Sequence, residues 1–481
     1  MTSNKNSKFA DLVPHPRVQD IYASDEVAPP NGLLNESADD LPTTDLSVDR
    51  YFSYEWHRQE VETVWRKTWQ FACRTEEIPD PGDYVVYDIV DDSIIILRTD
   101  SGDIAAYINS CLHRGTTLLE GCGHIDKFVC PYHGWQYDKS GQLGFVPGAW
   151  DFSHLNLDEM QLVRVKVDVW AGFVFINLDD DCAPLTDFLD ILPDHLDDFL
   201  IEDRYKAIHV SKVVPCNWKA AQEAFIEGYH VAQTHYEKEA DGRVAAVGPA
   251  VSNLDTSIQY DYWAPHVTRM IMAGGLPSGY VADRLADEQS IVDAYFGRRQ
   301  KQSVDLEPGQ SARNAIVRHN RQVWSERYAA DMSKKSDAEM IDQIQYSLFP
   351  NFTIWPTIAA PLLYRFRPYG DDPNAAIFEV FMLYPKTDDG SHPPPMKERR
   401  LSESDLWASV QELGSYGPVI DQDTPNFPRI QKGMKASRKQ TVSLANYQEN
   451  RIRAFHQTLE RYLAGEFAIL IADIDPDMPV D

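Results

Sequence analysis

Two pairs of cysteine and histidine residues have the types and spacing of metal ligands. Cys111 and His113 are separated by one residue, Cys130 and His133 are separated by two, and sixteen residues lie between the pairs. Two thiolates and two imidazoles can bind one tetrahedral zinc ion or a cluster of two iron ions. Packing without any metal is the third interpretation. The sequence therefore predicts a metal site here and leaves its kind open.

Spacing favours the iron cluster over zinc. Structural zinc sites usually place about two to four residues between paired ligands, so the single residue between Cys111 and His113 is tight for one ion. In a Rieske-type [2Fe–2S] cluster, one iron takes two thiolates and the other takes two imidazoles, so each loop gives one ligand to each iron. Nearby glycines would let backbone N–H groups approach the sulfurs: Gly115, Gly121, Gly123 and Gly134. The remaining cysteines are predicted to be core or loop thiols: Cys73, Cys122, Cys182 and Cys216.

A second set of candidate ligands lies further along the chain. Glu227, His230 and His235 fall at and just beyond the end of a predicted helix, 218–230. On a helix Glu227 and His230 share a face, whereas His230 and His235 differ by about 140°. Both imidazoles can reach one ion only if the helix ends or distorts within 231–234. Two histidines and one distant carboxylate would form a facial triad that leaves positions on Fe(II) open for dioxygen. Taken alone, such a pair is more often two surface histidines.

The pattern of apolar residues predicts the elements that position these ligands. Short β-type runs around the first set indicate a small antiparallel β domain, with strands at 84–87, 93–97, 104–108 and 172–178. Helical spacing predicts helices near 55–69, 218–230 and 441–463, a mostly helical region at 281–345, and a strand at 376–384. Three units follow: an extended or loosely attached arm over 1–45, a first domain over 46–165 and a second over 166–481.

Composition and charge limit the classes of partner. The chain has 481 residues and a formal net charge of −29, from 45 Lys and Arg against 74 Asp and Glu. This charge repels phosphate backbones and anionic lipids, so we expect neither nucleic acid nor a membrane as partner. The longest apolar run, 169–176, is far shorter than the ~20 residues of a membrane span, and the polar start lacks the apolar core of a signal peptide. The expected location is the cytoplasm.

The residues around the first ligand set carry a family resemblance. Segments 109–115, NSCLHRG, and 128–135, FVCPYHGW, resemble the cluster-binding loops of the Rieske non-heme iron ring-hydroxylating oxygenases, large (alpha) subunit. The resemblance extends from about Tyr51 to Tyr462, with both metal motifs in family order. It implies an α+β chain, in which a small antiparallel β Rieske domain precedes a helix-grip (START-like) catalytic domain with an antiparallel sheet and a long C-terminal helix.

The resemblance also implies roles for individual residues. Cys111, His113, Cys130 and His133 would hold the cluster, and His230 and His235 would hold the mononuclear Fe(II). The third ligand would come from 419–433, where Asp423 is the first choice and Asp421 the second; a solvated turn is the other interpretation. Glu227 would bridge to the cluster of the neighbouring subunit, unless it is only a solvated carboxylate. Glu223 receives no role, because many family members carry Asn there.

The implied activity is that of a terminal oxygenase. NADH or NADPH electrons would arrive through a ferredoxin and/or flavin reductase, and O2 would be used to cis-dihydroxylate an apolar, aromatic or polycyclic substrate. A monooxygenase or demethylase on the same centres is one alternative, and an electron carrier without oxygenase activity is another. The implied assembly is a homotrimer or an α₃β₃ complex with a small beta subunit. Arg114, Lys127 and Lys139 are candidates for a basic docking patch that opposes the global charge; the alternative is a solvated surface.

Overall fold

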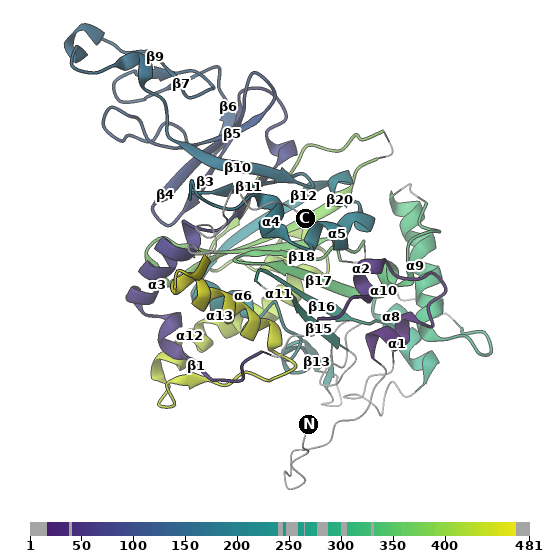
Figure 1. Ribbon diagram of the computed structural model, residues 1–481. Coiled ribbons are helices and arrows are strands. Elements are labelled where there is room, and N and C mark those ends of the chain that lie inside the picture. Colours follow the sequence, from purple (N-terminus) through teal and green to yellow (C-terminus); the bar gives the residue numbers. More distant parts are fainter. Residues whose placement is uncertain are drawn as a thin grey trace, which may run out of the picture.

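Two large β-sheets organise the molecule (Figure 1), one formed by strands between residues 70 and 177 and the other by strands between residues 204 and 401. The computed structural model describes residues 17–37, 41–238, 244–246, 258–263, 265–276, 287–299, 305–328, 331–358, 360–387 and 389–467. Within these ranges, no helix combines the length and the apolar character needed to cross a bilayer. The smaller sheet, at the upper left of Figure 1, projects from the larger one.

The first sheet has seven antiparallel strands in the order β2-β11-β10-β5-β4-β3-β6. Their bounds are β2 Gln70–Arg74, β3 Asp83–Ile89, β4 Asp92–Arg98, β5 Ile104–Ile108, β6 Cys122–His124, β10 Arg164–Trp170 and β11 Phe173–Asn177. A small three-stranded sheet at the tip contains β7 (Phe128–Val129), β8 (Gln136–Tyr137) and β9 (Leu143–Phe145). The predicted strands at 84–87, 93–97, 104–108 and 172–178 are confirmed, within a residue or two of their ends.

The predicted change of domain between residues 165 and 166 falls inside β10. β10 pairs with β5 on one side and with β11 on the other, so both strands belong to the first sheet. Ala171 and Gly172 form the turn between them with positive φ angles of 49° and 78°. The apolar hairpin looks like one continuous run in the sequence, which hid the turn. We propose that the first unit extends at least to Asn177.

The second sheet has eight strands in the order β15-β16-β17-β18-β19-β20-β12-β21. Their bounds are β12 Arg204–Val214, β15 Ile258–Trp263, β16 Val267–Met272, β17 Gln343–Leu348, β18 Phe352–Ile354, β19 Leu362–Tyr369, β20 Asp372–Pro385 and β21 Arg399–Leu401. All pairs are antiparallel except β12 with β21, which is parallel. The predicted strand at 376–384 is confirmed and lies inside the longer β20. Two short pairs complete the strands: β1 (Leu46–Ser47) with β22 (Thr441–Val442), and β13 (Tyr236–Lys238) with β14 (Val244–Ala246).

Helices cover both faces of the eight-stranded sheet. One face packs against α6 (Trp218–Glu223), α11 (Tyr416–Asp423), α12 (Phe427–Ala436) and α13 (Asn450–Leu463). The other face packs against α4 (Leu185–Leu189) and α5 (Leu192–Leu196). Between β16 and β17, a separate small core is formed by α8 (Glu288–Arg299), α9 (Ala312–Tyr328) and α10 (Asp337–Ile341). Four shorter α-helices are also present in the part of the chain that the structure describes: α1 (Val18–Tyr22), α2 (Asn31–Leu34), α3 (Tyr54–Glu60) and α7 (Val231–Thr234).

Several predicted helices differ from the observed ones at their ends. The helix predicted at 55–69 is α3 followed by a wider helical turn over Val61–Trp65. The helix predicted at 441–463 begins only at Asn450, because residues 441–442 pair with β1 instead. The region predicted to be mostly helical over 281–345 contains three helices in its described residues and then enters β17 at Gln343. Tertiary pairing, which local periodicity does not encode, decides these ends.

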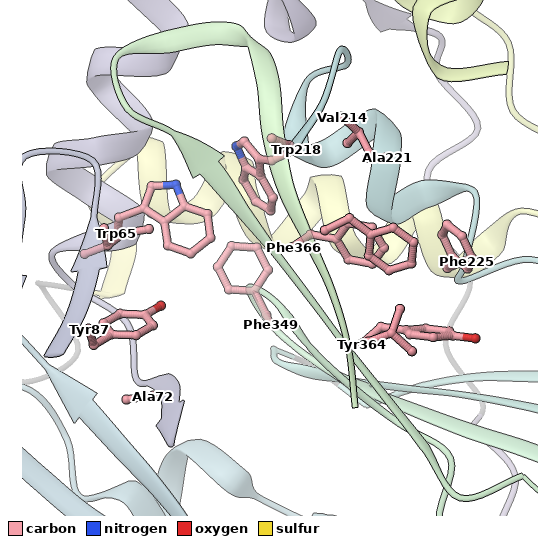
Figure 2. Close-up of a cluster of buried hydrophobic side chains, with 14 of the residues drawn as sticks. Trp65, Ala72, Tyr87, Val214, Trp218, Ala221, Phe225, Phe349, Tyr364 and Phe366 are labelled. Atoms are coloured by element: carbon pink, nitrogen blue, oxygen red, sulfur yellow. The ribbon is translucent and has the colours of Figure 1, made fainter. Parts of the chain in front are cut away.

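Aromatic side chains join the helices to the sheet, and Figure 2 shows this core. The rings of Trp65 and Trp218 meet edge to face with centroids 4.8 Å apart. Phe225 packs against Tyr364 with centroids 5.1 Å apart. Phe352 lies on the other face, where it contacts Phe71, Phe173 and Phe175. Phe225 and Phe352 are therefore core residues.

The N-terminal arm was expected to be extended or loosely attached over 1–45, but residues 17–37 contain two short helices and make tertiary contacts. Asp25 accepts from Arg313 of α9 at 2.7 Å. Arg269 of β16 donates to the Gly32 carbonyl at 2.7 Å. The Ser37 backbone N–H donates to Asp261 of β15 at 2.9 Å. These polar residues form buried tertiary contacts that composition does not reveal; residues 1–16 and 38–40 lie outside the described ranges.

A buried charge network joins the two large sheets. Arg365 of β19 donates to Glu379 of β20 at 2.7 and 2.6 Å, and its remaining nitrogen donates to the carbonyls of Phe71 and Ala72 in the first sheet. Arg367 donates to the same Glu379 carboxylate at 2.9 Å. Burial raises the pKa of Glu379, but the two guanidinium groups outweigh it and hold that pKa well below the usual range. The Glu379 carboxylate between the two sheets is therefore ionised, and both of its oxygens accept hydrogen bonds.

Candidate functional site

The first four candidate ligands lie in two loops of matching geometry at the tip of the first domain. The Gly115 N–H donates to the Cys111 carbonyl at 2.9 Å, and the Gly134 N–H donates to the Cys130 carbonyl at 3.0 Å. Both glycines have φ near +74°, at 74° and 73°. Such left-handed positions favour glycine, because any other residue would place its Cβ against the backbone. Each loop thus turns back on itself directly after presenting one cysteine and one histidine.

The ligand atoms pair by type. The Nδ1 atoms of His113 and His133 are 3.1 Å apart. The two thiols are buried and interact with each other. Burial raises the pKa of Cys111, and the Tyr137 hydroxyl lies 3.4 Å from its sulfur. A thiol pair beside an imidazole pair is the donor set of a Rieske [2Fe–2S] cluster, so the residues present fit that group.

The second candidate set lies where α6 ends. Asn217 caps this helix by accepting from the Lys219 N–H at 3.1 Å, and the helix stops at Glu223 instead of continuing to residue 230. An irregular stretch follows, and then the single turn of α7 is flanked by His230 at its start and His235 at its end. The helical turn ends at Thr234, within the expected 231–234, but a second break that the sequence did not predict separates this turn from α6. The break lies before His230.

The last residue of α11 completes the set. Asp423 Oδ1 lies 3.5 Å from His230 Nε2 and 3.1 Å from His235 Nε2. Asp423 is 4% exposed, and its Oδ1 atom is buried without a well-formed hydrogen bond. A buried carboxylate oxygen left in this way is costly unless a cation satisfies it. Three donor atoms within 4.8 Å of one another fit a two-histidine, one-carboxylate Fe(II) site.

Each histidine is oriented through its other ring nitrogen. His230 Nδ1 lies 2.7 Å from Glu227 Oε1, and His235 Nδ1 lies 2.9 Å from Gln422 Oε1. Because both partners accept hydrogen bonds, each Nδ1 carries a proton, and Nε2 is the atom that would give its lone pair to a metal at the shared point. Glu227 Oε2 also accepts from the His230 backbone N–H at 3.1 Å. Sequence reasoning missed Gln422, because no spacing signal links it to a histidine so far away in the chain.

The structure separates Asp423 from the second choice, Asp421. The Asp421 carboxylate accepts from the backbone N–H groups of Trp407 and Ala408, both at 2.9 Å. It therefore caps the short helix Trp407–Ser409. Consecutive residues on a helix point about 100° apart, so neighbouring aspartates face different parts of the fold.

Electrostatics at the triad favour positive charge. Burial alone would lower the pKa of His230, but the charges of Glu227 and Asp423 outweigh it and raise that pKa to about 10. The Asp423 pKa is lowered, since the two imidazoles outweigh the effect of burial. A site that stabilises a proton in this way also stabilises a divalent cation in its place.

Glu223, which received no role from the sequence, is the centre of a buried network. It accepts from the Tyr51 hydroxyl at 2.9 Å and lies 2.7 Å from His456 Nε2. Arg50 lies 3.0 Å from His456 Nδ1. A guanidinium only donates, so His456 Nδ1 accepts and its Nε2–H donates to Glu223. The network ties α6 to the segment before α3 and to α13.

The predicted basic patch is smaller than expected. Lys139 forms an ion pair with Asp100 at 2.6 Å, and its side chain is only 13% exposed. Arg114 and Lys127 are exposed, and Arg114 lies over the Tyr132 ring at 5.4 Å. Two of the three candidate cations are thus available at the surface of the cluster loops.

Comparisons with known proteins identify the family of the two domains. Residues 68–154 match the Rieske [2Fe–2S] domain, and residues 196–465 match the ring hydroxylating alpha subunit (catalytic domain). The chain belongs to the ring-hydroxylating alpha-subunit family. Membership implies a Rieske cluster and a mononuclear iron as cofactors, and both donor sets described above lie within or beside the matched ranges.

Curated relatives of this alpha subunit include dioxygenases and monooxygenases. Benzene 1,2-dioxygenase subunit alpha from Pseudomonas putida is 33% identical over 193 residues, 39% of this chain and 43% of the relative. The carnitine monooxygenase oxygenase subunit of Escherichia coli K12 is 29% identical over 250 residues, 50% and 60% of the two chains. The glycine betaine monooxygenase oxygenase subunit of Chromohalobacter salexigens is 32% identical over 237 residues, 49% and 52%. The chain thus spans about half the length of the curated relatives it matches.

Solved structures show the same fold at low sequence identity. A quaternary ammonium Rieske monooxygenase aligns with a TM-score of 0.60 and 18% identity, covering 94% of this alpha subunit and 100% of that chain. Naphthalene 1,2-dioxygenase with indole bound aligns with a TM-score of 0.62 and 20% identity, covering 89% and 95%. The predicted α+β architecture of a Rieske domain followed by a catalytic domain is confirmed.

Proposed function

We propose that this alpha subunit is the terminal oxygenase of a multicomponent system. The carrying observation is that His230 Nε2, His235 Nε2 and Asp423 Oδ1 converge at one buried point. An Fe(II) ion there would supply dioxygen activation, and the cluster held by Cys111, His113, Cys130 and His133 would supply electrons that originate in NADH or NADPH. A ferredoxin and/or flavin reductase is the proposed donor, and Arg114 and Lys127 are its proposed docking cations.

The side chains around the ion would prepare the site before any substrate arrives. Glu227 and Gln422 would hold the two imidazoles in the tautomer that presents Nε2. Glu227 would also connect His230 with the cluster of a neighbouring subunit, in a homotrimer or an α₃β₃ assembly with a small beta subunit. We place this assembly in the cytoplasm, as the sequence predicts.

For the substrate we propose an apolar aromatic or polycyclic compound that undergoes cis-dihydroxylation. Aromatic residues near the metal loop support this choice: the Tyr260 hydroxyl approaches Gly228, and the charge of Asp423 contributes to raising the pKa of the buried Tyr364. Aromatic side chains bind arenes through stacked or edge contacts. They also attract a quaternary ammonium group, because a cation is favoured over an aromatic face. Monooxygenation or demethylation of such a compound is therefore the second candidate, favoured by the carnitine and glycine betaine relatives.

One experiment tests the class and separates the two substrates. The purified protein is reconstituted with iron and sulfide, its iron is counted, and O2 uptake is followed with a generic reductase. We expect two cluster irons plus one mononuclear iron per chain. Mass spectrometry with ¹⁸O2 distinguishes a dihydrodiol carrying both oxygen atoms from an aldehyde released by demethylation. If the protein holds only two irons and neither arenes nor quaternary ammonium compounds stimulate O2 uptake, the protein is an electron carrier instead.

A further inference from the structure

A buried hydrogen-bond relay reaches the backbone break that separates α6 from the metal-binding turn. The carbonyl of Phe225, two residues beyond the end of α6, accepts from Gln345 Nε2 at 2.7 Å. Gln345 Oε1 accepts in turn from Arg451 Nη1 at 2.6 Å. Gln345 belongs to β17 and Arg451 to α13, and neither is exposed. The relay therefore attaches the break to the sheet through Gln345 and to the C-terminal helix through Arg451.

Arg451 is an unusual residue to find at this place. Its side chain is 0% exposed, and burial lowers its pKa to about 9. Its three nitrogens donate to neutral oxygens: Gln345 Oε1, Thr268 Oγ1 at 3.1 Å and Ser347 Oγ at 2.8 Å. Burying a charge without a charged acceptor costs free energy. The guanidinium differs from a neutral amide or hydroxyl in one respect that matters here, because it presents only donors to Gln345.

The chemistry of the guanidinium sets the orientation of the Gln345 amide. Arginine has five N–H donors and no acceptor, so the oxygen of Gln345 must face Arg451. The NH2 end of the amide is then directed at the Phe225 carbonyl. A flipped amide would place two oxygens against each other at Phe225 and two N–H donors against each other at Arg451. Arg451 thus makes Gln345 a donor of fixed direction toward the break.

We propose that Gln345, oriented by Arg451, is a positioning residue of the mononuclear metal site. By holding the Phe225 carbonyl it fixes where α6 ends, and so fixes the turn that brings Glu227 and His230 opposite Asp423. The hydrogen bond lies in a buried, low-dielectric environment, where its geometry is strongly enforced. Gln345 touches neither ligand nor metal, so the role is indirect. The inference rests on the proposed function to the extent that the triad binds a divalent metal.

The sharpest test is Gln345→Glu. The substitution is isosteric, and the new carboxylate still accepts from Arg451 and gives it a counter-charge, while it removes the donor to Phe225. We expect unfolding by urea to occur at the same or a higher midpoint, and Co(II) added alone to bind the triad about tenfold more weakly or worse. The visible spectrum of bound Co(II) should change, and the Rieske spectrum should not. Affinity within twofold of the wild type, with an unchanged Co(II) spectrum, would overturn the proposal.

Arg451→Met and Arg453→Met form a matched pair of controls on the same helix. Arg453 is also buried, but it donates to backbone carbonyls of Pro42, Thr44 and Ala445, away from the metal loop. Both variants lose a buried guanidinium, and we expect only Arg451→Met to weaken Co(II) binding. Equal weakening would assign the effect to general loosening and overturn the role. The proposed metal site itself would be rejected if the wild-type protein bound no Co(II), or if the Asp423→Ala variant bound Co(II) as tightly as the wild type.

Discussion

At the scale of single residues, three neighbours on α11 act in three directions. Asp421 caps the helix Trp407–Ser409, Gln422 orients His235, and Asp423 faces both imidazoles. The residue types at 421–423 do not by themselves show these three roles, because each role depends on how the helix is rotated relative to partners far away in the chain. Substitution of Asp421 is therefore an internal control for the assignment of Asp423 as the ligand.

We predict that Asp423→Ala loses the mononuclear metal and keeps the cluster spectrum, because only Asp423 supplies the third donor atom. Asp421→Ala should keep the metal and lower the free energy of unfolding by about 1 kcal/mol, the usual effect of losing a helix cap. Iron counting with the cluster absorbance as internal standard measures both. The reverse pattern, with iron lost only from the Asp421 variant, would transfer the ligand role to Asp421.

Glu227→Gln tests whether the charge of this side chain matters beyond its hydrogen bond. The amide oxygen can still accept from His230 Nδ1, so we expect both metal centres to remain loaded. Turnover should fall by roughly tenfold to a hundredfold, the usual effect of changing an outer-shell partner. Rapid mixing of the reduced protein with O2 and substrate would report the rate of cluster oxidation. Near-normal product formation would reject the bridging role.

At the scale of elements, α6 is a short helix whose side chains are all buried, and a buried ion pair anchors it. Lys219 donates to Glu60 of α3 at 2.5 Å, and Trp218 donates to the same carboxylate at 3.0 Å. We predict that Lys219→Met destabilises the protein by about 3–5 kcal/mol, because it leaves the Glu60 carboxylate buried without its cation. The double variant Lys219→Met, Glu60→Leu should recover part of this loss in urea unfolding. A single-variant effect under about 1 kcal/mol would contradict this account of the anchor.

The same element shows how far the sequence reaches. The cysteine and histidine pairs lie close together in the chain, so their spacing was enough to predict the cluster loops and their order. The helix at 218–230 was predicted too long, because the residue types of Ala224 and Phe225 give no sign that the Phe225 carbonyl bonds to Gln345 on a distant strand. Glu223 and Gln422 were missed for the same reason, since their partners are distant in sequence. Local pattern predicts the existence of elements, and long-range hydrogen bonds decide their ends.

At the scale of the whole molecule, buried neutral histidines make stability depend on pH. His195 lies 3.2 Å from the Tyr346 hydroxyl and 3.2 Å from the Asn35 amide nitrogen. Burial, with a smaller contribution from Arg269, lowers its pKa to about 4. The unfolded chain then binds the proton first, so stability is lost as the pH falls below the unfolded value of about 6.5.

We predict that acidification from pH 7 to pH 5 removes about 2 kcal/mol of stability through His195 alone. His266, whose pKa burial lowers to about 3, should act in the same direction. Urea unfolding at several pH values measures the slope, and His195→Gln should flatten it while lowering stability at pH 7. A slope unchanged in that variant would exclude His195 as its source.

The charge network between the two sheets also governs cooperativity. If the cluster domain opened while the catalytic sheet stayed folded, Arg365 would lose the Phe71 and Ala72 carbonyls and the guanidinium groups around Glu379 would face an incomplete shell. That partly unfolded species carries stranded buried charge and is disfavoured by several kcal/mol. Bleaching of the cluster and melting of the catalytic sheet should therefore occur as one event on heating, so that the redox centre is lost only when the whole fold is lost.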